Sequence, residues 1–150
     1  MKLFFLRHGE AAYNKHDDIR ELTARGCDDV KRVAQHQRAA LADVQRVFVS
    51  PITRAQQTAD IVCREAHILV PRETVDWLIH EMPLSEALAA LARLDGNVLL
   101  VGHQPLAGKL VESLCGLHAG TTSIGTANMI EMEGDAFISG ALHIVHHQSP

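Results

Sequence analysis

The sequence predicts an α/β domain, a three-layer α/β/α sandwich in which helices cover both faces of a mostly parallel central sheet. Short apolar runs typical of strands alternate with longer stretches whose apolar residues recur at helical spacing. Apart from Asn97, the runs at 3–6 and 97–101 are apolar throughout, as parallel strands buried on both faces are. The last quarter instead has the pattern of a hairpin, which predicts an antiparallel edge. No repeat or linker interrupts 1–150, so we expect a single domain.

The composition argues against several classes of protein. The 150 residues carry a net charge of −4, and 47% of them are hydrophobic and 21% charged, which is typical of a soluble globular domain. Mild acidity and the presence of only one Trp and one Tyr argue against nucleic-acid binding. No segment approaches the ~18 consecutive apolar residues of a membrane span. The apolar run at 3–6 is also too short for a signal-peptide core.

The cysteines and histidines indicate which compartment, disulfides and metal sites to expect. Cys27, Cys63 and Cys115 are odd in number and share no short spacing, which argues against a disulfide framework and a thiolate zinc site. We therefore expect a cytoplasmic monomer that uses no metal and no cofactor. Ten histidines are present. The histidines in 143–147 are expected to form a solvated strand end, because no partnered carboxylates accompany them.

The first half of the chain predicts two strand–helix units. After the strand at 3–6, a helix begins near Thr23 and presents one face formed by Val30, Val33, Ala34, Gln37 and Leu41. The second strand, 46–49, ends at Ser50-Pro51, where Ser is expected as N-cap and Pro as the first helical residue. The buried face of that second helix is expected to contain Ile52, Ala55, Ala59 and Val62.

The second half continues the alternation. A third short apolar run, 67–70, ends at Pro71, and a helix face follows that is closed by Asp95-Gly96. The central strand at 97–101 leads through 102–105 into another helix. The final strands are expected at 126–132 and 136–145, around 133–135. The two helix faces comprise Leu84, Ala87, Leu88 and Leu91 in the first helix, and Leu106, Leu110, Ser113 and Leu114 in the second.

Basic side chains follow three of the predicted strands. Arg7 and His8 follow the first, Arg54 the second and His103 the central one. Ligands of open α/β sheets bind outside the carboxyl ends of the strands, so these four side chains are expected to meet. Arg54 lies in the first turn of its helix, where the macrodipole disfavours a cation by ~0.3–1 kcal/mol unless an anion intervenes. Helix-start N–H groups and guanidinium forks together suit a phosphate.

A pair of histidines can complete such a site. Imidazole changes charge near neutral pH, so one histidine can be a neutral nucleophile and the other a protonated stabiliser. Taken singly, each of these four residues is more often structural: Arg7 and Arg54 would be surface ion-pair partners, and His8 and His103 satisfied core histidines. Their placement at three strand ends favours phosphoryl transfer without metal.

Three motifs resemble those of the histidine phosphatase superfamily, which has the phosphoglycerate-mutase-like fold. They are Leu6-Arg7-His8-Gly9-Glu10, Ser50-Pro51-x-x-Arg54-Ala55-x-Gln57-Thr58-Ala59 and Val101-Gly102-His103-Gln104-Pro105. The phrase Arg20-Glu21-Leu22-Thr23-x-x-Gly26 and the short chain are most similar to the small SixA-type phosphohistidine phosphatases. The resemblance implies that His8 is the nucleophile that becomes phosphorylated. Arg7, Arg54 and His103 would then form the rest of the phosphate pocket, with Arg20 as a further contact.

The resemblance also implies a proton donor between the second and third motifs. Glu81 is the candidate there, and His80 beside it is a second one, although Glu81 is equally a solvated loop carboxylate. An alkoxide leaving group needs a proton far more than an imidazole does. We also expect the nitrogen of His8 that does not attack to donate to a backbone carbonyl, that of Gly9 or a neighbour.

Three functions stand as hypotheses. The first is hydrolysis of phosphohistidine in a signalling or phosphotransfer protein, either a histidine phosphotransfer domain or a phosphocarrier. The absence of a large insertion between Ala59 and Leu84 favours this function, because an open pocket can admit a protein-borne group. The second is hydrolysis of a small phosphate monoester with Glu81 as general acid. The third is a non-catalytic phosphate-binding module, which the intact set of Arg7, His8 and His103 disfavours.

Overall fold

The computed structural model covers residues 1–150 and contains one six-stranded sheet. The strands lie in the order β3-β2-β4-β1-β5-β6. The first four run parallel to one another, whereas β5 and β6 are antiparallel at one side of the sheet. The strands are β1 (Lys2–Arg7), β2 (Arg46–Val49), β3 (Arg72–Thr74), β4 (Val98–Gly102), β5 (Met129–Gly134) and β6 (Leu142–Gln148).

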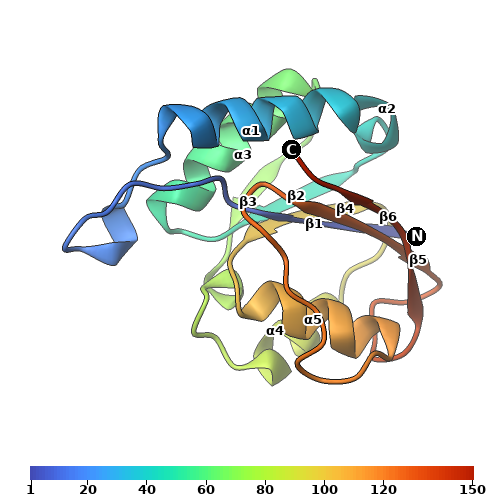
Figure 1. Cartoon of the computed structure of the whole chain (residues 1–150). Helices are drawn as coiled ribbons and strands as arrows, with labels where there is room; N and C mark the ends of the chain where they lie inside the picture. Colours follow the sequence, from blue (N-terminus) through green and yellow to red (C-terminus); the bar gives the residue numbers. More distant parts are fainter.

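Helices cover both faces of the sheet (Figure 1). On one face lie α1 (Ala24–His36), the short α2 (Arg38–Leu41) and α3 (Thr53–Glu65), and on the other lie α4 (Leu84–Leu91) and α5 (Leu106–Cys115). Single 3-10 turns are found at η1 (Asp17–Ile19) and η2 (Asp76–Leu78). This arrangement confirms the predicted three-layer α/β/α sandwich with a mostly parallel sheet. No helix has both the length and the apolar character needed to cross a membrane.

Successive side chains of β1 point to opposite faces of the sheet, so they contribute to two separate hydrophobic cores. Phe4 and Leu6 belong to one cluster of buried side chains, together with residues of α1 and α3. Leu3 and Phe5 point the other way, into a second cluster with residues of α4 and α5. Each fully buried side chain of this size stabilises the fold by ~1.5–3 kcal/mol. The two cores therefore clamp β1 between them and fix the position of the residues that follow it.

Most of the expected elements are present. The first helix is capped by Thr23, whose side chain accepts from the amide of Gly26 at 2.9 Å, and its predicted face is buried through Leu41, with Gln37 marking the break before α2. The predicted strand at 46–49 coincides with β2. The four residues expected on the buried face of α3 are all buried. Gly96 has a positive φ of 77°, but it does not close α4, which ends at Leu91 with Ala92 as its C-cap.

Three other local expectations were wrong. The helix after β2 begins at Thr53 with Ile52 as N-cap, so Pro51 lies outside it and Ser50 does not cap it. The run 67–70 is not a strand: the chain reaches the edge of β2 only where Val47 pairs with Arg72, and Leu69 is 94% exposed. The final hairpin is wider than predicted, because the connection from β5 to β6 buries Phe137 in the core.

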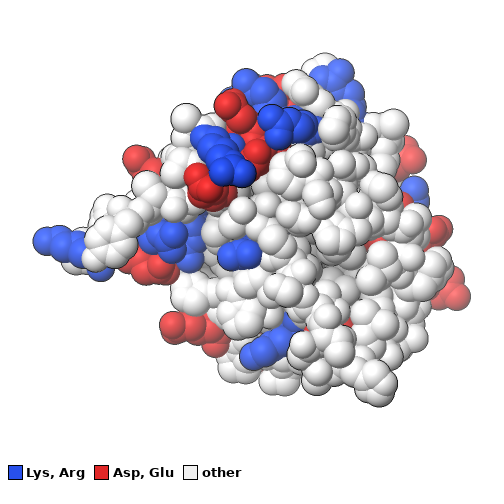
Figure 2. Space-filling model, in the orientation of Figure 1, with Lys and Arg blue, Asp and Glu red and all other residues white.

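Charged side chains are interspersed on the face of the molecule seen in Figure 2, where arginines and lysines alternate with acidic groups instead of forming a basic stripe. The segment between β1 and α1, with η1 at its tip, extends away from the body of the domain (Figure 1). Its base is held by a bridge between Ala11 and Leu22. This extension lies beside the carboxyl ends of the parallel strands.

Candidate active site

The ends of three neighbouring strands bring the predicted side chains together. In the sheet, β4 lies between β1 and β2, so His103 after β4 lies beside His8 after β1, with ring centroids 5.1 Å apart. Arg54, in the first turn of α3, reaches the same place. A polar pocket of about 530 Å³ opens here, and it is lined by Arg7, His8, Glu10, Ala11, Asp17, Arg20, Arg54, His80, Glu81, Gln104 and Thr126.

His8 is fixed as a neutral imidazole. Its Nδ1 lies 2.8 Å from the carbonyl oxygen of Gly9, which can only accept, so the proton is on Nδ1 as expected from the sequence. Burial is the main cause that lowers the pKa of His8 to about 4, and the charges of Arg54, Arg7 and Arg20 add to it, against the bond to Gly9. Nε2 is left with a free lone pair that faces the Nε–H of Arg54 at 3.3 Å. It is thus the nitrogen able to attack.

The surroundings of His103 disfavour its charged form, whereas the sequence led us to expect a protonated stabiliser here. Burial is the main cause that lowers the pKa of His103 to about 2, and the electrostatic effects of His8 and Arg54 add to it. Its Nε2 lies 2.7 Å from Oγ of Ser50, and that oxygen also accepts from the amide of Ile52 at 3.3 Å. The Ser50 hydroxyl can donate to Nε2 or accept from it; as the donor, it leaves the imidazole proton on Nδ1. Nδ1 has no partner within the protein. The residue is only 1% exposed.

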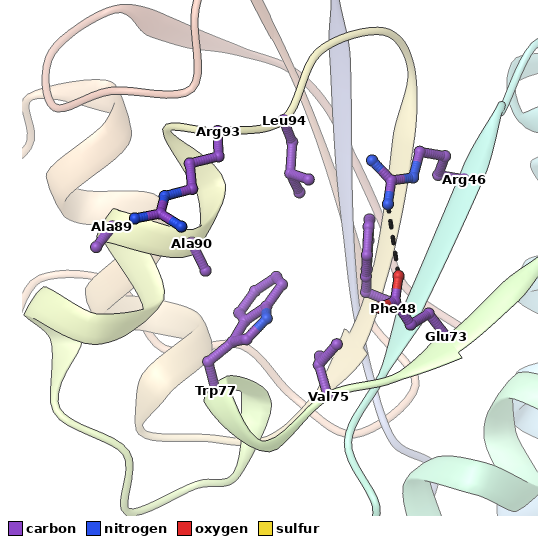
Figure 3. A pocket seen from close by; sticks show the side chains of 9 residues that line it. All are labelled: Arg46, Phe48, Glu73, Val75, Trp77, Ala89, Ala90, Arg93 and Leu94. Carbon is purple, nitrogen blue, oxygen red and sulfur yellow. Dashed lines mark hydrogen bonds and ion pairs between the residues drawn. The ribbon is translucent and has the colours of Figure 1, made fainter.

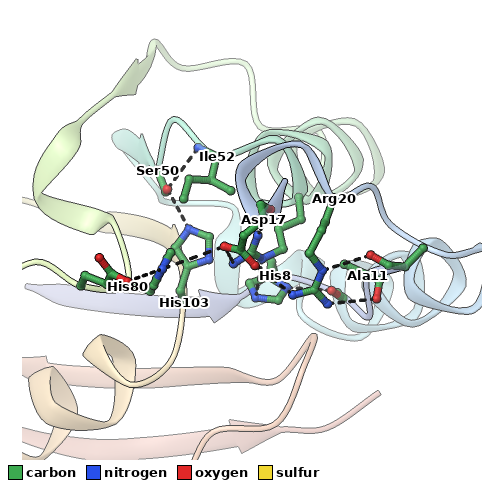
Figure 4. A network of polar contacts seen from close by, with 12 residues as sticks. His8, Ala11, Asp17, Arg20, Ser50, Ile52, His80 and His103 are labelled. Atoms are coloured by element: carbon green, nitrogen blue, oxygen red, sulfur yellow. Dashed lines mark hydrogen bonds and ion pairs between the residues drawn. The ribbon is translucent and has the colours of Figure 1, made fainter. Parts of the chain in front are cut away.

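The three arginines are anchored in different ways. Arg54, 5% exposed, donates through Nη1 to the backbone oxygen of Asp17 at 2.8 Å. Arg7 donates through Nη1 to the carbonyl of Ile124, while its buried Nε has no partner. Burial and the charge of Arg54 lower the pKa of Arg7. Arg20 is held by the carbonyls of Ala11 and Ala12 at the base of the extension (Figure 4).

Asp17 is part of this cluster, although it belongs to none of the three sequence motifs. Its carboxylate lies 3.3 Å from Nη2 of Arg54 and 3.3 Å from Nη1 of Arg20. Desolvation opposes its ionisation, but the bonds to Arg20 and the charge of Arg54 prevail and lower its pKa. The side chain of Asp17 is 54% exposed, so its carboxylate pairs with the guanidinium groups of Arg54 and Arg20 from the solvent side of the pocket.

The two candidate proton donors lie at the mouth of the pocket. The ring of His80 meets that of His103 edge-on, with centroids 5.4 Å apart. Its Nε2 lies 3.6 Å from Oε1 of Glu81 and 4.0 Å from Oδ2 of Asp17. The side chain of Glu81 is 85% exposed, whereas that of His80 is 25% exposed.

Residues of the second motif support the first. The hydroxyl of Thr58 accepts from the amide of Gly9 at 3.1 Å and donates to the carbonyl of Arg54 at 2.8 Å. Gly9 has no room for a side chain, because a Cβ there would lie 2.8 Å from the backbone oxygen of Gly26. α1 and α3 thus hold the backbone beside His8 at a fixed distance from Arg54.

A second pocket, of about 370 Å³, is largely apolar and lies between β2, β3 and α4 (Figure 3). Trp77 projects into it, and Arg46 pairs with Glu73 across its edge at 3.4 Å. It contains no histidine and no nucleophilic side chain. No group of three or more His, Cys, Asp or Glu side chains in the chain is arranged to hold a metal ion.

Comparison with known proteins gives consistent results. Residues 3–85 match the model of the histidine phosphatase superfamily (branch 1). Phosphohistidine phosphatase SixA of Escherichia coli (strain K12) is 33% identical over 120 residues, covering 77% of this chain and 74% of that protein. The structure of the protein histidine phosphatase SixA complexed with tungstate superimposes with a TM-score of 0.88 and 30% identity, over 100% of this chain and 97% of that one. A 2,3-bisphosphoglycerate-dependent phosphoglycerate mutase of Actinobacillus pleuropneumoniae (serotype 5b, strain L20) is 32% identical over 87 residues, covering 54% of this chain and 38% of the mutase.

Proposed function

Because this chain belongs to the histidine phosphatase superfamily, we propose that it removes the phosphoryl group from phosphohistidine in a signalling or phosphotransfer protein. The observation that carries the proposal is the state of His8, a neutral imidazole whose Nε2 lone pair faces the guanidinium of Arg54 in a polar pocket. The 33% identity to a phosphohistidine phosphatase supports the nature of the substrate.

In the first step, Nε2 of His8 attacks phosphorus in line with the departing nitrogen. Arg7 and Arg54, with Arg20 as a further contact, neutralise charge on the phosphoryl oxygens. His103 contributes as a neutral hydrogen-bond donor through Nδ1–H, the ring nitrogen that has no partner within the protein. Fixed donors of this kind need no reorganisation as charge develops.

In the second step, water attacks the phosphorylated His8. Because Nδ1 of His8 keeps its proton on the carbonyl of Gly9, the ring departs as neutral imidazole rather than as an imidazolate. The phosphorylated ring carries positive charge, which the same carbonyl stabilises. The hydrogen bond to Gly9 therefore serves both the formation and the breakdown of the intermediate.

The mouth of the pocket favours a protein-borne substrate. The connection from the end of α3 to the start of α4 holds only β3 and η2, and Glu81 on it projects into solvent. A small monoester would require Glu81 as a positioned acid, and its exposure gives that alternative less support. We further propose that the protein acts as a monomer in the cytoplasm, where its three free cysteines remain reduced.

The test uses a carrier protein labelled with ³²P on histidine, incubated with the wild-type chain and with His8→Ala. We expect release of phosphate and transient, acid-labile label on the wild-type chain only. A panel of small phosphate monoesters serves as the comparison. Faster hydrolysis of a monoester than of the phosphorylated carrier would overturn the assignment of the substrate, and absence of label and turnover with every substrate would leave only phosphate binding.

A further inference from the structure

His80 has two unlike sides. Its Nδ1 is buried and has no hydrogen-bond partner, whereas its Nε2 faces the carboxylates of Glu81 and Asp17 at 3.6 and 4.0 Å. The ring packs edge-on against His103, and the residue lines the pocket that holds His8 and Arg54. Nε2 is thus the nitrogen of His80 that can exchange a proton at the mouth of the pocket.

The groups that face His80 come from three parts of the chain. Asp17 is contributed by η1 and is shared with Arg54 and Arg20, Glu81 follows His80 directly, and the neutral ring of His103 comes from the end of β4. Both carboxylates lie within 4.0 Å of Nε2, and Arg7, Arg20 and Arg54 line the same pocket. The carboxylates attract the imidazolium, which is the form that can donate a proton.

We propose that His80 is a further catalytic residue, which protonates the leaving imidazole of phosphohistidine and then deprotonates the attacking water. The inference rests on the proposed function. It deepens that function by assigning the proton transfers, which His8 and the three arginines cannot perform. Because Glu81 is almost fully exposed, its part is to hold the imidazole of His80 in place rather than to donate.

The proton cycle balances. In the first step Nε2–H of His80 gives its proton to the free ring nitrogen of the substrate, the bond from Nε2 of His8 to phosphorus forms, and the substrate's P–N bond breaks. The substrate leaves as neutral imidazole and His80 becomes neutral. In the second step water attacks phosphorus and its proton goes to Nε2 of His80. The products are neutral His8, inorganic phosphate and protonated His80, so each turnover restores the starting state.

The decisive comparison is between two small substrates. In free phosphohistidine the second ring nitrogen must gain a proton before the ring can leave as neutral imidazole. In 1-methyl-3-phosphoimidazolium that nitrogen carries a methyl group instead, so the ring leaves without any proton. Single-turnover phosphorylation of His8 is measured by rapid quench for the wild-type chain, His80→Asn and His80→Gln. His118→Asn serves as control, because it changes an exposed histidine outside the pocket.

We expect His80→Asn to slow phosphorylation by phosphohistidine about 100-fold. Phosphorylation by the methylated compound should change by less than about threefold. Dephosphorylation should also slow, so the variant gives a normal burst with the methylated compound followed by slow turnover. Equal losses with both substrates, or no loss with either, would overturn the role of His80. If the wild-type chain transfers no phosphoryl group from phosphohistidine, whether free or borne by the labelled carrier protein, the proposed function itself fails, which is a different result. If His80→Asn does not fold, the same comparison of the two substrates is made with His80→Gln.

Discussion

The hydroxyl of Ser50 lies 2.7 Å from Nε2 of His103, although the two residues are 53 positions apart in the chain. This contact orients the imidazole, and with the Ser50 hydroxyl as the donor the ring proton lies on Nδ1. We expect Ser50→Ala to lower kcat about fivefold, corresponding to the loss of ~1 kcal/mol of hydrogen bonding, with little change in KM. Steady-state hydrolysis of phosphohistidine measures both constants. Ser113→Ala, which removes a surface hydroxyl paired with Ser139, should leave kcat unchanged, and equal effects of the two substitutions would contradict the role of Ser50.

Asp17 competes with any anion for the guanidinium of Arg54. Replacing its carboxylate by an amide should therefore tighten the binding of a tetrahedral oxyanion. We expect Asp17→Asn to lower the inhibition constant of tungstate about fivefold, in keeping with the ~1 kcal/mol of a partly exposed ion pair. Inhibition of phosphohistidine hydrolysis provides the measurement. Asp18→Asn changes the charge equally without touching Arg54 and is the matched control; an inhibition constant that shifts to the same extent in both variants would show a general effect of net charge.

Thr58 joins α3 to the loop of the nucleophile through two buried hydrogen bonds. Thr58→Val keeps the shape of the side chain but leaves the amide of Gly9 without an acceptor. We expect the free energy of unfolding to fall by about 1–3 kcal/mol, the cost of an unsatisfied buried donor. Urea denaturation measures it. Thr74→Val removes an exposed hydroxyl on β3 and should cost less than about 0.5 kcal/mol. A similar cost at both positions would argue against a special role for the contact with Gly9.

Neutral His103 makes stability depend on pH. Its pKa is about 2 in the folded chain and ~6.5 in an unfolded one, so between these values the unfolded state binds more protons. The free energy of unfolding should therefore decrease as the pH falls below ~6.5, by about 2 kcal/mol from this residue between about pH 7 and pH 5. His8, with a folded pKa of about 4, acts in the same direction.

Urea denaturation of the wild-type chain and of His103→Gln at the two pH values separates this contribution. The variant should lose less stability on acidification, because its side chain does not titrate. His143→Gln, on the exposed strand β6, should behave like the wild-type chain. An identical pH dependence in His103→Gln and wild type would show that His103 is not held neutral by the fold.

Much of the site could be predicted because parallel strands place their carboxyl ends together. Arg7, His8, Arg54 and His103 each follow a strand or begin the next helix, so their meeting follows from the order of the elements. The protonation of His103 could not be predicted in the same way. It depends on burial beside two groups, His8 and Arg54, whose distances appear only in the folded chain.

Other residues escaped prediction for a similar reason. Ser50 has the local features of an N-cap, and only the neighbouring strand shows that its oxygen serves His103. The run 67–70 is as apolar as a strand, but the turn after α3 delays pairing with β2 until Arg72. Asp17 belongs to a polar segment with no periodicity, and its partner Arg54 lies 37 positions away. In each case the deciding contact is between segments that are distant in sequence.

The position of β4 in the sheet has a consequence for how the protein acquires activity during its synthesis. β1 pairs only with β4 and β5, and β4 alone separates β1 from β2. A nascent chain that has emerged only as far as α4 already contains His8 and Arg54, but it lacks the strand that brings them together. Such a chain also lacks His103, so the four basic side chains of the site are present together only once β4 has been made and has paired with β1 and β2.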